Sequence, residues 1–503
     1  MKVLSAAAVR QLDQETIKRQ KISSAALMER ASSVFVEEFL GRFPTKMLVY
    51  VFCGTGNNGG DGMVITRLLR EQGWKVEVFV LGSIEKGSPD FRYNLSRVGE
   101  FSYLKEIAEL PKIARDGIII DALFGSGLSR PIAGIYKDLI VSLNQQSCIK
   151  IAVDMPSGLF MDQCLPSSQV AFKANHTFSF QLPKLPFFMA DCHEYVGEWH
   201  LLDIGLDEQF QEDVESNTHF TIQKNISGIL PKRKRFTHKN EVGRLQVVGG
   251  QKGMMGAVTL TSLAALRAGV GLLKVTCPSI GLDVLQIALP EAMVEPDNDE
   301  DIVTELRTTE NAIVIGPGLG IDARTQSALI GFLKIRETPV VIDADAINIL
   351  ASHMRQSRIP IPENSILTPH PGEFRRLVGS WENEFQKIEM LRSFCLENKI
   401  NVVLKGAFSA VCSSSGDVYF NSSGNPALAT AGSGDVLAGV VGSLLAQGLK
   451  SIDALKLGVY AHGLAADLWV QRNGAHGLIA SDIVDMLPFA FSRISSLNKP
   501  EVN

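Results

Sequence analysis

Residues 421–448 read NSSGNPALATAGSGDVLAGVVGSLLAQG, and this stretch is the most informative in the chain. Residues 432–434 (Gly-Ser-Gly) form a turn without bulky side chains, and from Asp435 onward apolar residues recur at helical spacing. The sequence therefore predicts a glycine turn that leads directly into a helix. The first N–H groups of a helix have no internal partners and lie at the positive end of its dipole, so they suit a phosphate.

Asp435 lies at the start of this predicted helix. Its carboxylate could cap the helix, or it could accept a proton from a hydroxyl group beside a bound phosphate. The pattern Gly-x-Gly-Asp also occurs in capped core helices, so taken alone it leaves both interpretations open.

Composition limits the classes of protein to consider. A chain of 503 residues is too long for one ordinary core and predicts about two to four domains. The net charge of −5 gives no general attraction to nucleic acid or anionic membrane. Seven scattered cysteines favour a reducing cytoplasm over a disulfide framework, and no unbroken run reaches the roughly 18 apolar residues of a membrane span. We expect a soluble cytoplasmic protein without nucleic-acid or membrane partners.

The first half contains a strand, a glycine-rich loop and a helix in succession. An apolar run at 47–52 precedes the loop Cys53–Asp61, and a helical pattern continues through Leu69. The loop lacks the Gly-Lys-Ser/Thr of a Walker A motif, but its four glycines and two asparagines let backbone amides surround a phosphate. Cys53 has no histidine or lysine near it in sequence to lower its pKa, so we do not expect it to act as a nucleophile.

Two further strand-to-loop junctions follow in the first half. The strand 117–120 leads into Asp121–Pro131, and the strand 149–153 leads into Asp154–Gly158. Ligands of open parallel sheets bind at the carboxyl ends of the strands, so the three loops are expected to face one crevice. Any single aspartate in such a place could be a helix cap, but three glycine-rich acidic loops in succession favour a site.

A polar, acidic segment at 207–225 has no clear period and predicts a connector, which places the domain boundary between residues 216 and 217. The basic run Lys232–Arg235 that follows is more typical of a solvated loop or a local anion contact than of a nucleic-acid surface. Beyond it, strands and helices alternate, and strand ends meet Gly316–Gly320, Asp343–Asp345 and Pro369–Phe374. This alternation predicts a mostly parallel sheet covered by helices on both faces.

Several motifs resemble those of known families. The sequence GSGDVLAG at 432–439 resembles the anion-hole motif of the ribokinase-like fold, and together with HPGE at 370–373 it is similar to ADP-dependent NAD(P)H-hydrate dehydratases. In the first half, NNGGDG (57–62), DALFGSGL (121–128) and VDMPSG (153–158) resemble the NAD(P)H-hydrate epimerase domain that is often fused to them. The resemblance covers nearly the whole chain. It implies an α/β protein with an N-terminal Rossmann-like three-layer domain, 1–216, and a C-terminal ribokinase-like domain, 217–503.

The resemblance implies repair of hydrated NADH and NADPH. The first domain would interconvert the R and S hydrates, and the second would dehydrate the S hydrate with ADP and Mg²⁺. The partners would be the hydrated dinucleotides and ADP, with assembly into a homo-oligomer. The alternative is a small-molecule kinase of the ribokinase-like class with a non-catalytic binding module in front of it.

For the first domain, the resemblance implies that Asp154 is the catalytic acid or base. Asn58, Asp121 and Ser157 would hold a potassium ion, because it prefers hard oxygen ligands. The substrate would contact Asn57, Asn58, Gly59, Gly60, Asp61, Gly125, Ser126, Gly127, Leu128, Ser129, Arg130, Pro131 and Asp154.

For the second domain, the resemblance implies that Asp435 is the catalytic base. Glu373 would hold magnesium through a water molecule. The hydrated substrate would contact Ala257, Gly318, Gly320, His370 and Asp435. The nucleotide would contact Lys405, Gly406, Ala407, Phe408, Ser409, Ala431, Gly432, Ser433 and Gly434.

Overall fold

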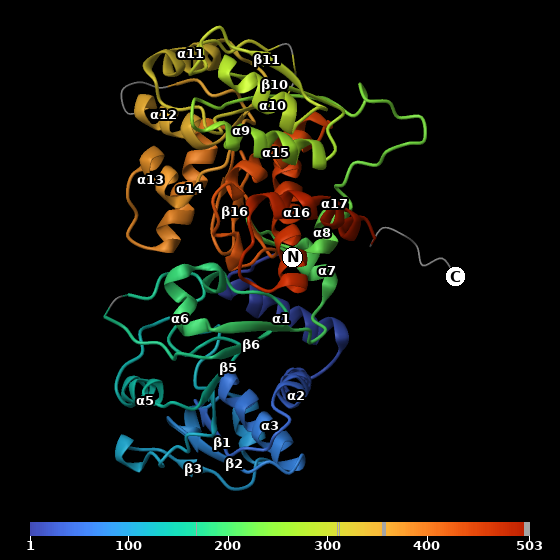
Figure 1. Cartoon of the computed structure of the whole chain (residues 1–503). Coiled ribbons are helices and arrows are strands. Elements are labelled where there is room, and N and C mark those ends of the chain that lie inside the picture. Colours follow the sequence, from blue (N-terminus) through green and yellow to red (C-terminus); the bar gives the residue numbers. More distant parts are fainter. Residues whose placement is uncertain (167, 309, 311, 355–358, 497–503) are drawn as a thin grey trace. The chain divides into compact units, whose positions relative to one another are not determined.

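The computed structural model describes residues 1–166, 168–308, 310, 312–354 and 359–496 (Figure 1). These residues form two compact units. The first unit contains Lys2–Ser216 with residues 383–385, and the second contains Met1, Asn217–Glu382 and the described residues from Gln386 onward. Each unit is built around one sheet, and the two are described separately.

The first unit contains a seven-stranded sheet in which every pair of neighbouring strands is parallel. The strand order is β3-β2-β1-β4-β5-β6-β7, the order of a Rossmann-like sheet with one added strand. The strands are β1 (Val49–Cys53), β2 (Val76–Val80), β3 (Ser102–Tyr103), β4 (Ile118–Ala122), β5 (Ile149–Val153), β6 (His176–Phe180) and β7 (Glu198–Leu202). The helices are α1 (Ala6–Gln20), α2 (Ser24–Arg42), α3 (Asn57–Glu71), α4 (Pro89–Leu95), α5 (Ile135–Asn144), α6 (His193–Val196) and α7 (Glu208–Asp213).

Helices cover both faces of this sheet. On one face Phe35 and Phe39 of α2 and Met63 of α3 pack against β1, β2 and β4. On the other face Leu139 and Leu143 of α5 pack against the alternate residues of the same strands. Successive residues of a strand point to opposite faces, so the continuously apolar strands serve both layers. The expected three-layer α/β class is confirmed.

The order of the strands reverses between β1 and β4, and the loops after these two strands leave the sheet in opposite directions. The loop after β1 is shorter than predicted, because α3 begins at Asn57 with Gly56 as its N-cap. The prediction that a loop extends to Asp61 is therefore wrong: residues 57–61 form the first turn of a helix. Asp121 likewise belongs to β4 and does not follow its end.

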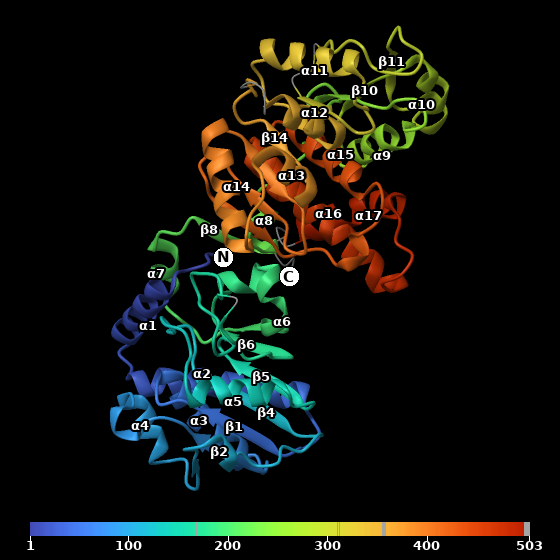
Figure 2. The same ribbon diagram turned by 90° about the vertical axis from the view of Figure 1, so that its left-hand side faces the viewer.

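The second unit contains a ten-stranded sheet of order β11-β10-β9-β12-β13-β14-β15-β16-β17-β8. Figure 2 labels β8, β10, β11 and β14 of this sheet. Only the pairs β15–β16 and β16–β17 are antiparallel. The strands are β8 (Thr218–Thr221), β9 (Arg244–Val248), β10 (Leu272–Cys277), β11 (Met293–Pro296), β12 (Ala312–Ile315), β13 (Val341–Ile342), β14 (Ile366–Leu367), β15 (Asn401–Leu404), β16 (Ala410–Cys412) and β17 (Val418–Asn421). The helices are α8 (Gln223–Ser227), α9 (Met255–Arg267), α10 (Leu282–Ala288), α11 (Ala323–Ile335), α12 (Ala344–Met354), α13 (Pro371–Val378), α14 (Glu384–Asn398), α15 (Ser433–Ala446), α16 (Ser451–Asn473) and α17 (Ala480–Ser496).

The predicted helix after the Gly-Ser-Gly turn is α15, and it packs closely against α9. A Cβ atom on Gly439 would lie 2.0 Å from the carbonyl oxygen of Thr261, so only glycine allows the two backbones to approach this far. Leu437 and Val441 of α15 are buried against the sheet, while Val436 and Val440 are buried in a cluster with α16 and α17. The start of α15 is therefore held on three sides by buried contacts.

The segment 207–225 is more ordered than its polar composition predicts. It contains α7, β8 and α8, and β8 pairs in parallel with β17 through all four of its residues, from Thr218 to Thr221. The prediction of an irregular connector is wrong here, because backbone hydrogen bonds to β17 stabilise this strand without an apolar alternation in the sequence.

The boundary between residues 216 and 217 remains a prediction that fragments can test. We expect 1–216 and 217–503 to fold separately, because each contains a complete sheet with its own buried clusters. Each fragment should melt cooperatively, as measured by circular dichroism. The control is a pair of fragments cut between residues 203 and 204, which should leave the first without α7. Failure of both 1–216 and 217–503 to melt cooperatively would contradict the boundary.

Candidate active sites

The first unit has a cavity of about 840 Å³ beside the point where the strand order reverses. Most predicted substrate residues line it: Asn57, Asn58, Asp61, Gly125, Ser126, Gly127, Leu128, Ser129, Arg130 and Asp154. Its wall also includes residues from α1 and α2, among them Asp13 and Met28, together with Lys184. The structure therefore brings together all three predicted loops.

Gly59, Gly60 and Pro131 are not among the lining residues. A Cβ atom on Gly59 would lie 1.8 Å from the carbonyl oxygen of Gly54, and one on Gly60 would lie 2.7 Å from the sulfur of Met28. These two glycines thus let the first turn of α3 pack tightly against its surroundings. Their place in the motif reflects packing at least as much as ligand contact.

Asp154 lies directly after β5 with a φ of +63°, in the left-handed region that is uncommon for a residue with a side chain. Its carboxylate accepts hydrogen bonds from Lys184 Nζ at 2.5 Å and from the Phe180 N–H at 3.2 Å. Burial alone would raise its pKa, but the charge and hydrogen bond of Lys184, with smaller help from Phe180 and Ser126, hold the pKa below its usual range. The carboxylate is therefore ionised and paired with a fully buried ammonium group.

Two more aspartates share this cavity, and sequence reasoning missed one of them. Burial, with the nearby charge of Asp154, raises the pKa of Asp13 to about 6, although Lys184 opposes the shift. Burial and the charges of Asp154 and Asp13 raise the pKa of Asp61 well above its usual range. Asp13 lies on α1, where the sequence shows only an acid among charges on an amphipathic helix, so no local signal identifies it. The cavity thus combines one ionised acid with two acids that hold protons more readily.

Of the three predicted potassium ligands, Asp121 and Ser157 are hydrogen-bonded to each other, and Asn58 is not part of this pair. The carboxylate of Asp121 accepts hydrogen bonds from Ser157 Oγ at 2.6 Å and from the Ser157 N–H at 2.8 Å. Asn58 faces the next loop, since a Cβ atom on Gly125 would lie 3.0 Å from Asn58 Oδ1. The buried amide nitrogen of Asn58 has no hydrogen-bond partner among the described residues. Such a set of carboxylate, hydroxyl, amide and carbonyl groups suits a hard cation.

In the second unit, Asp435 lies in the first turn of α15 and Gly434 lies beside Lys405. A Cβ atom on Gly434 would be 3.0 Å from Lys405 Nζ, which in turn is 3.5 Å from Asp343 Oδ1. Burial raises the pKa of Asp435 to about 7; the charges of Asp343, Asp345 and Glu373 add to the shift, and Lys405 opposes it. A carboxylate at the mouth of a helix therefore titrates near neutral pH.

The motif Asp343–Ala344–Asp345 takes part in this site, although sequence reasoning gave it no role. Ala344 has a φ of +49°, an outlier of the kind that gathers at functional sites. The buried Asp343 accepts a hydrogen bond from Thr368 Oγ1 at 2.6 Å, and Asp345 Oδ2 accepts one from the Gly320 N–H at 2.9 Å. The sequence did contain a signal for this part of the site, namely two acids that are separated by one small residue and directly follow a strand.

His370 and Glu373 form the reciprocal cap of α13. The His370 N–H donates to Glu373 Oε2 at 2.8 Å, and His370 Nδ1 accepts from the Gly372 N–H at 3.0 Å. Burial raises the pKa of Glu373, while its hydrogen bond from the His370 N–H and the charge of Lys405 oppose the shift. His370 and Glu373 therefore cap α13 and also lie beside Asp435 and Lys405.

The small residues predicted to contact the substrate lie together. A Cβ atom on Gly318 would be 3.2 Å from the Cβ atom of Ala257, and one on Gly320 would be 2.0 Å from Gln251 Oε1. These residues follow β12 and open α9, next to the loop after β9, where the order of the second sheet reverses.

The predicted nucleotide residues come from two segments. Gly406–Ser409 form a turn after β15, in which the Gly406 N–H donates to Ser409 Oγ at 3.3 Å. Ala431 and Gly432 precede α15, and Ser433 opens it. The carbonyl oxygen of Ser433 lies 3.0 Å from Nε2 of the buried His462, and burial lowers the pKa of this histidine to about 4. The neutral imidazole therefore contacts the turn without adding a charge to it.

Two family models match the chain. Residues 245–489 match the model described as NAD(P)H-hydrate dehydratase, and residues 24–185 match the model described as YjeF-related protein N-terminus. A bifunctional NAD(P)H-hydrate repair enzyme of Coxiella burnetii is 37% identical over 471 residues, which cover 92% of this chain and 94% of the relative. The chain belongs to the family of bifunctional NAD(P)H-hydrate repair enzymes. A member from Escherichia coli is 33% identical over 483 residues, which cover 95% of this chain and 90% of the relative.

A solved structure supports the fold of the second unit. The ADP/ATP-dependent NAD(P)H-hydrate dehydratase of Bacillus subtilis, co-crystallised with ATP and Mg²⁺, is 32% identical, with a TM-score of 0.50. It is covered completely by 56% of this chain. The expectations of a ribokinase-like second domain and of a bifunctional repair enzyme are thereby confirmed. None of the described helices is long and apolar enough to cross a bilayer.

The unusual acid Asp13 leads to a prediction about stability. Its pKa in the folded protein, about 6, exceeds the ordinary value of 3.8, so ionised Asp13 lowers the free energy of unfolding as pH rises from about 4 to 6. Asp13→Asn should therefore raise the melting temperature at pH 7.5 by about 2–6 °C and change it little at pH 4. Differential scanning calorimetry at both pH values measures the effect, with the exposed Asp116→Asn as control. A lower melting temperature at pH 7.5 would contradict the assignment.

Proposed function

We propose that this chain repairs hydrated NADH and NADPH with two active sites, one in each unit. The first interconverts the R and S hydrates, and the second dehydrates the S hydrate with ADP. The observation that carries the proposal is the carboxylate of Asp435 in the first turn of α15, with Lys405 beside the same turn, in a chain of this family. The cavity of the first unit, with its ionised Asp154, supports the second activity.

In the first unit, Asp154 would act as the proton acceptor at the hydrated nicotinamide ring. It is suited to this role because its pairing with Lys184 keeps it ionised despite burial. Epimerisation must also return a proton, and Asp13 has a pKa of about 6, which makes it a proton donor near neutral pH in the same cavity. Burial, together with the negative charge of Asp154, keeps that proton on Asp13.

Asn58, Asp121 and Ser157 would hold a potassium ion beside this cavity. The ion would supply a fixed positive charge near the phosphates of the dinucleotide. Asp121 is suited to hold it because hydrogen bonds from Ser157 and the Leu123 N–H fix its orientation. Asn57 and the loop 125–130, which line the cavity, would contact the substrate.

In the second unit, the hydroxyl group of the hydrated ring is a poor leaving group. Transfer of a phosphoryl group from ADP to its oxygen would produce a phosphate ester and AMP. Loss of phosphate, together with a proton from the neighbouring ring carbon, would then restore the reduced ring. Asp435 would accept the hydroxyl proton, while the N–H groups of Ser433 and Gly434 at the start of α15 would stabilise charge on the phosphoryl group. Lys405 would place a positive charge beside the same phosphoryl group.

Glu373 would hold magnesium through a water molecule, and Asp343 is a further acid close to Lys405. Ala257, Gly318 and Gly320 would let the dinucleotide approach the backbone, with His370 at its edge. Residues 406–409 and 431–434 would contact ADP. The chain would work as a homo-oligomer in the cytoplasm, with no nucleic-acid or membrane partner.

Asp154→Asn should slow epimerisation by about two orders of magnitude or more, because the amide keeps the size of the side chain but cannot accept a proton. Asparagine also tolerates the positive φ at this position. Dehydration of the S hydrate should be unchanged. Chromatographic separation of the two epimers over time measures the rate, and Asp138→Asn, an exposed acid of α5, is the control. Undiminished epimerisation would remove Asp154 from the mechanism.

Potassium should strengthen binding of the hydrated dinucleotide to the first unit or speed its epimerisation, while sodium at the same ionic strength should do so less. Asp121→Asn should abolish the difference between the two ions, because it removes the only charged ligand of the proposed set. Isothermal titration with each salt measures binding without relying on turnover. Equal affinities and rates in potassium and sodium would count against the site.

Asp435→Asn should lower ADP-dependent dehydration by about two orders of magnitude or more and leave epimerisation unchanged. The amide retains a capping oxygen, so a residue that only capped α15 would tolerate the change. In the unmutated chain kcat/KM should rise with pH to a plateau above about 7, since only ionised Asp435 accepts a proton. Recovery of reduced-nicotinamide absorbance measures the rate.

The matched control for this variant is Asp453→Asn, because Asp453 lies in the first turn of α16, which follows the C-terminal end of α15, whereas Asp435 lies at the start of α15. The same assay separates the repair enzyme from a kinase. A kinase would accumulate a lasting phosphate ester, whereas a dehydratase releases phosphate and restored NADH. A stable ester without a gain in absorbance would overturn the proposed function.

A further inference from the structure

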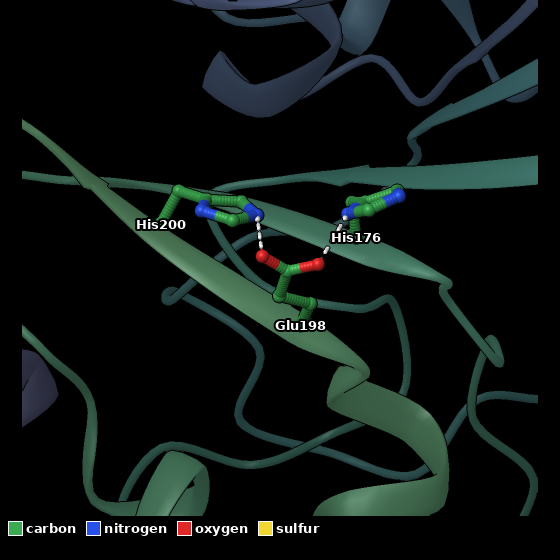
Figure 3. Close-up of side chains that lie close together, drawn as sticks. All are labelled: His176, Glu198 and His200. Atoms are coloured by element: carbon green, nitrogen blue, oxygen red, sulfur yellow. Dashed lines mark ion pairs between the residues drawn. The ribbon is translucent and has the colours of Figure 1, made fainter. Parts of the chain in front are cut away.

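A second group of polar side chains lies in the first unit, apart from the cavity and its acids. His176 begins β6, and Glu198 and His200 lie on the neighbouring edge strand β7 (Figure 3). In the parallel register His176 is opposite Glu198 and Phe178 is opposite His200, so all three side chains emerge on one face of the sheet. This His-Glu-His cluster is the only group of three or more histidine, cysteine or acidic residues with ligand-like spacing among the described residues.

We propose that His176, Glu198 and His200 form a binding site for a zinc-class divalent ion, which no part of the repair reaction uses. His176 Nδ1 lies 3.6 Å from Glu198 Oε2, and His200 Nε2 lies 3.5 Å from Glu198 Oε1. Two ligand atoms that are each about 2.1 Å from a tetrahedral zinc ion lie about 3.4 Å apart. The three ligand atoms all fall within 4.8 Å of one another, so small rotations bring them around one ion.

The two ring nitrogens that face the carboxylate are buried, and neither has a hydrogen-bond partner in the part of the chain that the structure describes. Buried polar atoms of this kind are uncommon, and a site for an ion is one of the ordinary reasons for them. Figure 3 shows both rings turned toward the carboxylate of Glu198. The rings are also held in place by edge contacts, from Phe43 to His176 and from Phe178 to His200, with centroids 5.8 and 5.4 Å apart.

The ligand chemistry selects the class of ion. Two imidazoles and one carboxylate with an open fourth position are the ligands of zinc sites, whereas magnesium and calcium prefer oxygen alone. Burial, together with the charge of Arg42, lowers the pKa of His200, and burial also lowers that of His176. Both rings are neutral at pH 7, and a neutral imidazole carries one lone pair that can bind a metal.

Arg42, the last residue of α2, competes with the ion. One of its guanidinium nitrogens lies 2.8 Å from His200 Nδ1, and another lies 3.7 Å from Glu198 Oε1. While Arg42 donates to Nδ1, a neutral His200 carries its proton on Nε2, the atom that would bind the metal. Binding therefore requires Arg42 to leave, after which the proton moves to Nδ1 and Nε2 is free. The arginine side chain is 36% exposed and also pairs with Glu38, so it has a place to go.

The test is a Zn²⁺ titration of the full chain after a chelator has removed any bound metal. Excess Mg²⁺ is present throughout, so that it occupies the oxygen-rich sites. Isothermal titration should detect one site that weakens at least about tenfold in His176→Gln and in His200→Gln. The exposed His193→Gln on α6 is the control and should bind as the unmutated chain does. Co²⁺ in place of Zn²⁺ should give the visible absorption of a tetrahedral ion, lost in the same two variants.

Arg42→Gln gives an independent test that keeps all three ligands. It should bind Zn²⁺ at least about tenfold more tightly, because the competing cation and its hydrogen bond to His200 are gone. Zn²⁺ should also raise the melting temperature of this variant and of the unmutated chain, but not that of His176→Gln. No Zn²⁺ site in the unmutated chain, equal affinity in His176→Gln, or unchanged affinity in Arg42→Gln would each overturn the proposal.

Discussion

Parallel pairing is the constraint on which both units depend. A strand cannot pair in parallel with the next strand without a crossover, and here helices provide most of the crossovers. All strands of the first sheet, and β9 to β15 of the second, therefore end at one edge, where their loops meet. Where the strand order reverses, at β1 and β4 and again at β9 and β12, the loops separate and leave room for a ligand. The positions of both candidate sites follow from this geometry before any side chain is considered.

The two sites then use burial in opposite ways. In the first, Lys184 offsets the cost of burying Asp154, and the carboxylate stays ionised beside two acids that retain protons. In the second, Lys405 only partly offsets the burial of Asp435 and the charges of three neighbouring acids, so Asp435 titrates near pH 7. Each lysine thus adjusts how readily its acid exchanges a proton, and the different outcomes suit two different reactions.

Much of this organisation is predictable from the sequence, because glycine-rich turns after apolar runs mark the strand ends. The helix at Asp435, the loops after β4 and β5, and the mixed α/β class all follow from such local patterns. Asp13 does not, because its importance arises from contact with strand ends that lie far away in the sequence. The strand β8 is also missed, since its stability comes from pairing with β17 and four polar or aromatic residues give no periodic signal. Local chemistry is visible in sequence, whereas long-range burial and pairing are not.

The His-Glu-His cluster shows the same limit from another side. His176 and His200 are 24 positions apart and form no spaced metal motif, and only the register of β6 against β7 makes them neighbours. A sheet edge exposes unpaired backbone groups, and a side-chain cluster that ties the last strand to the one before it would restrain that edge. In the described structure Arg42 provides this restraint by bridging His200 and Glu198 to the end of α2. A bound ion would replace one cation by another at the same place, so the edge strand would stay anchored while α2 lost a contact.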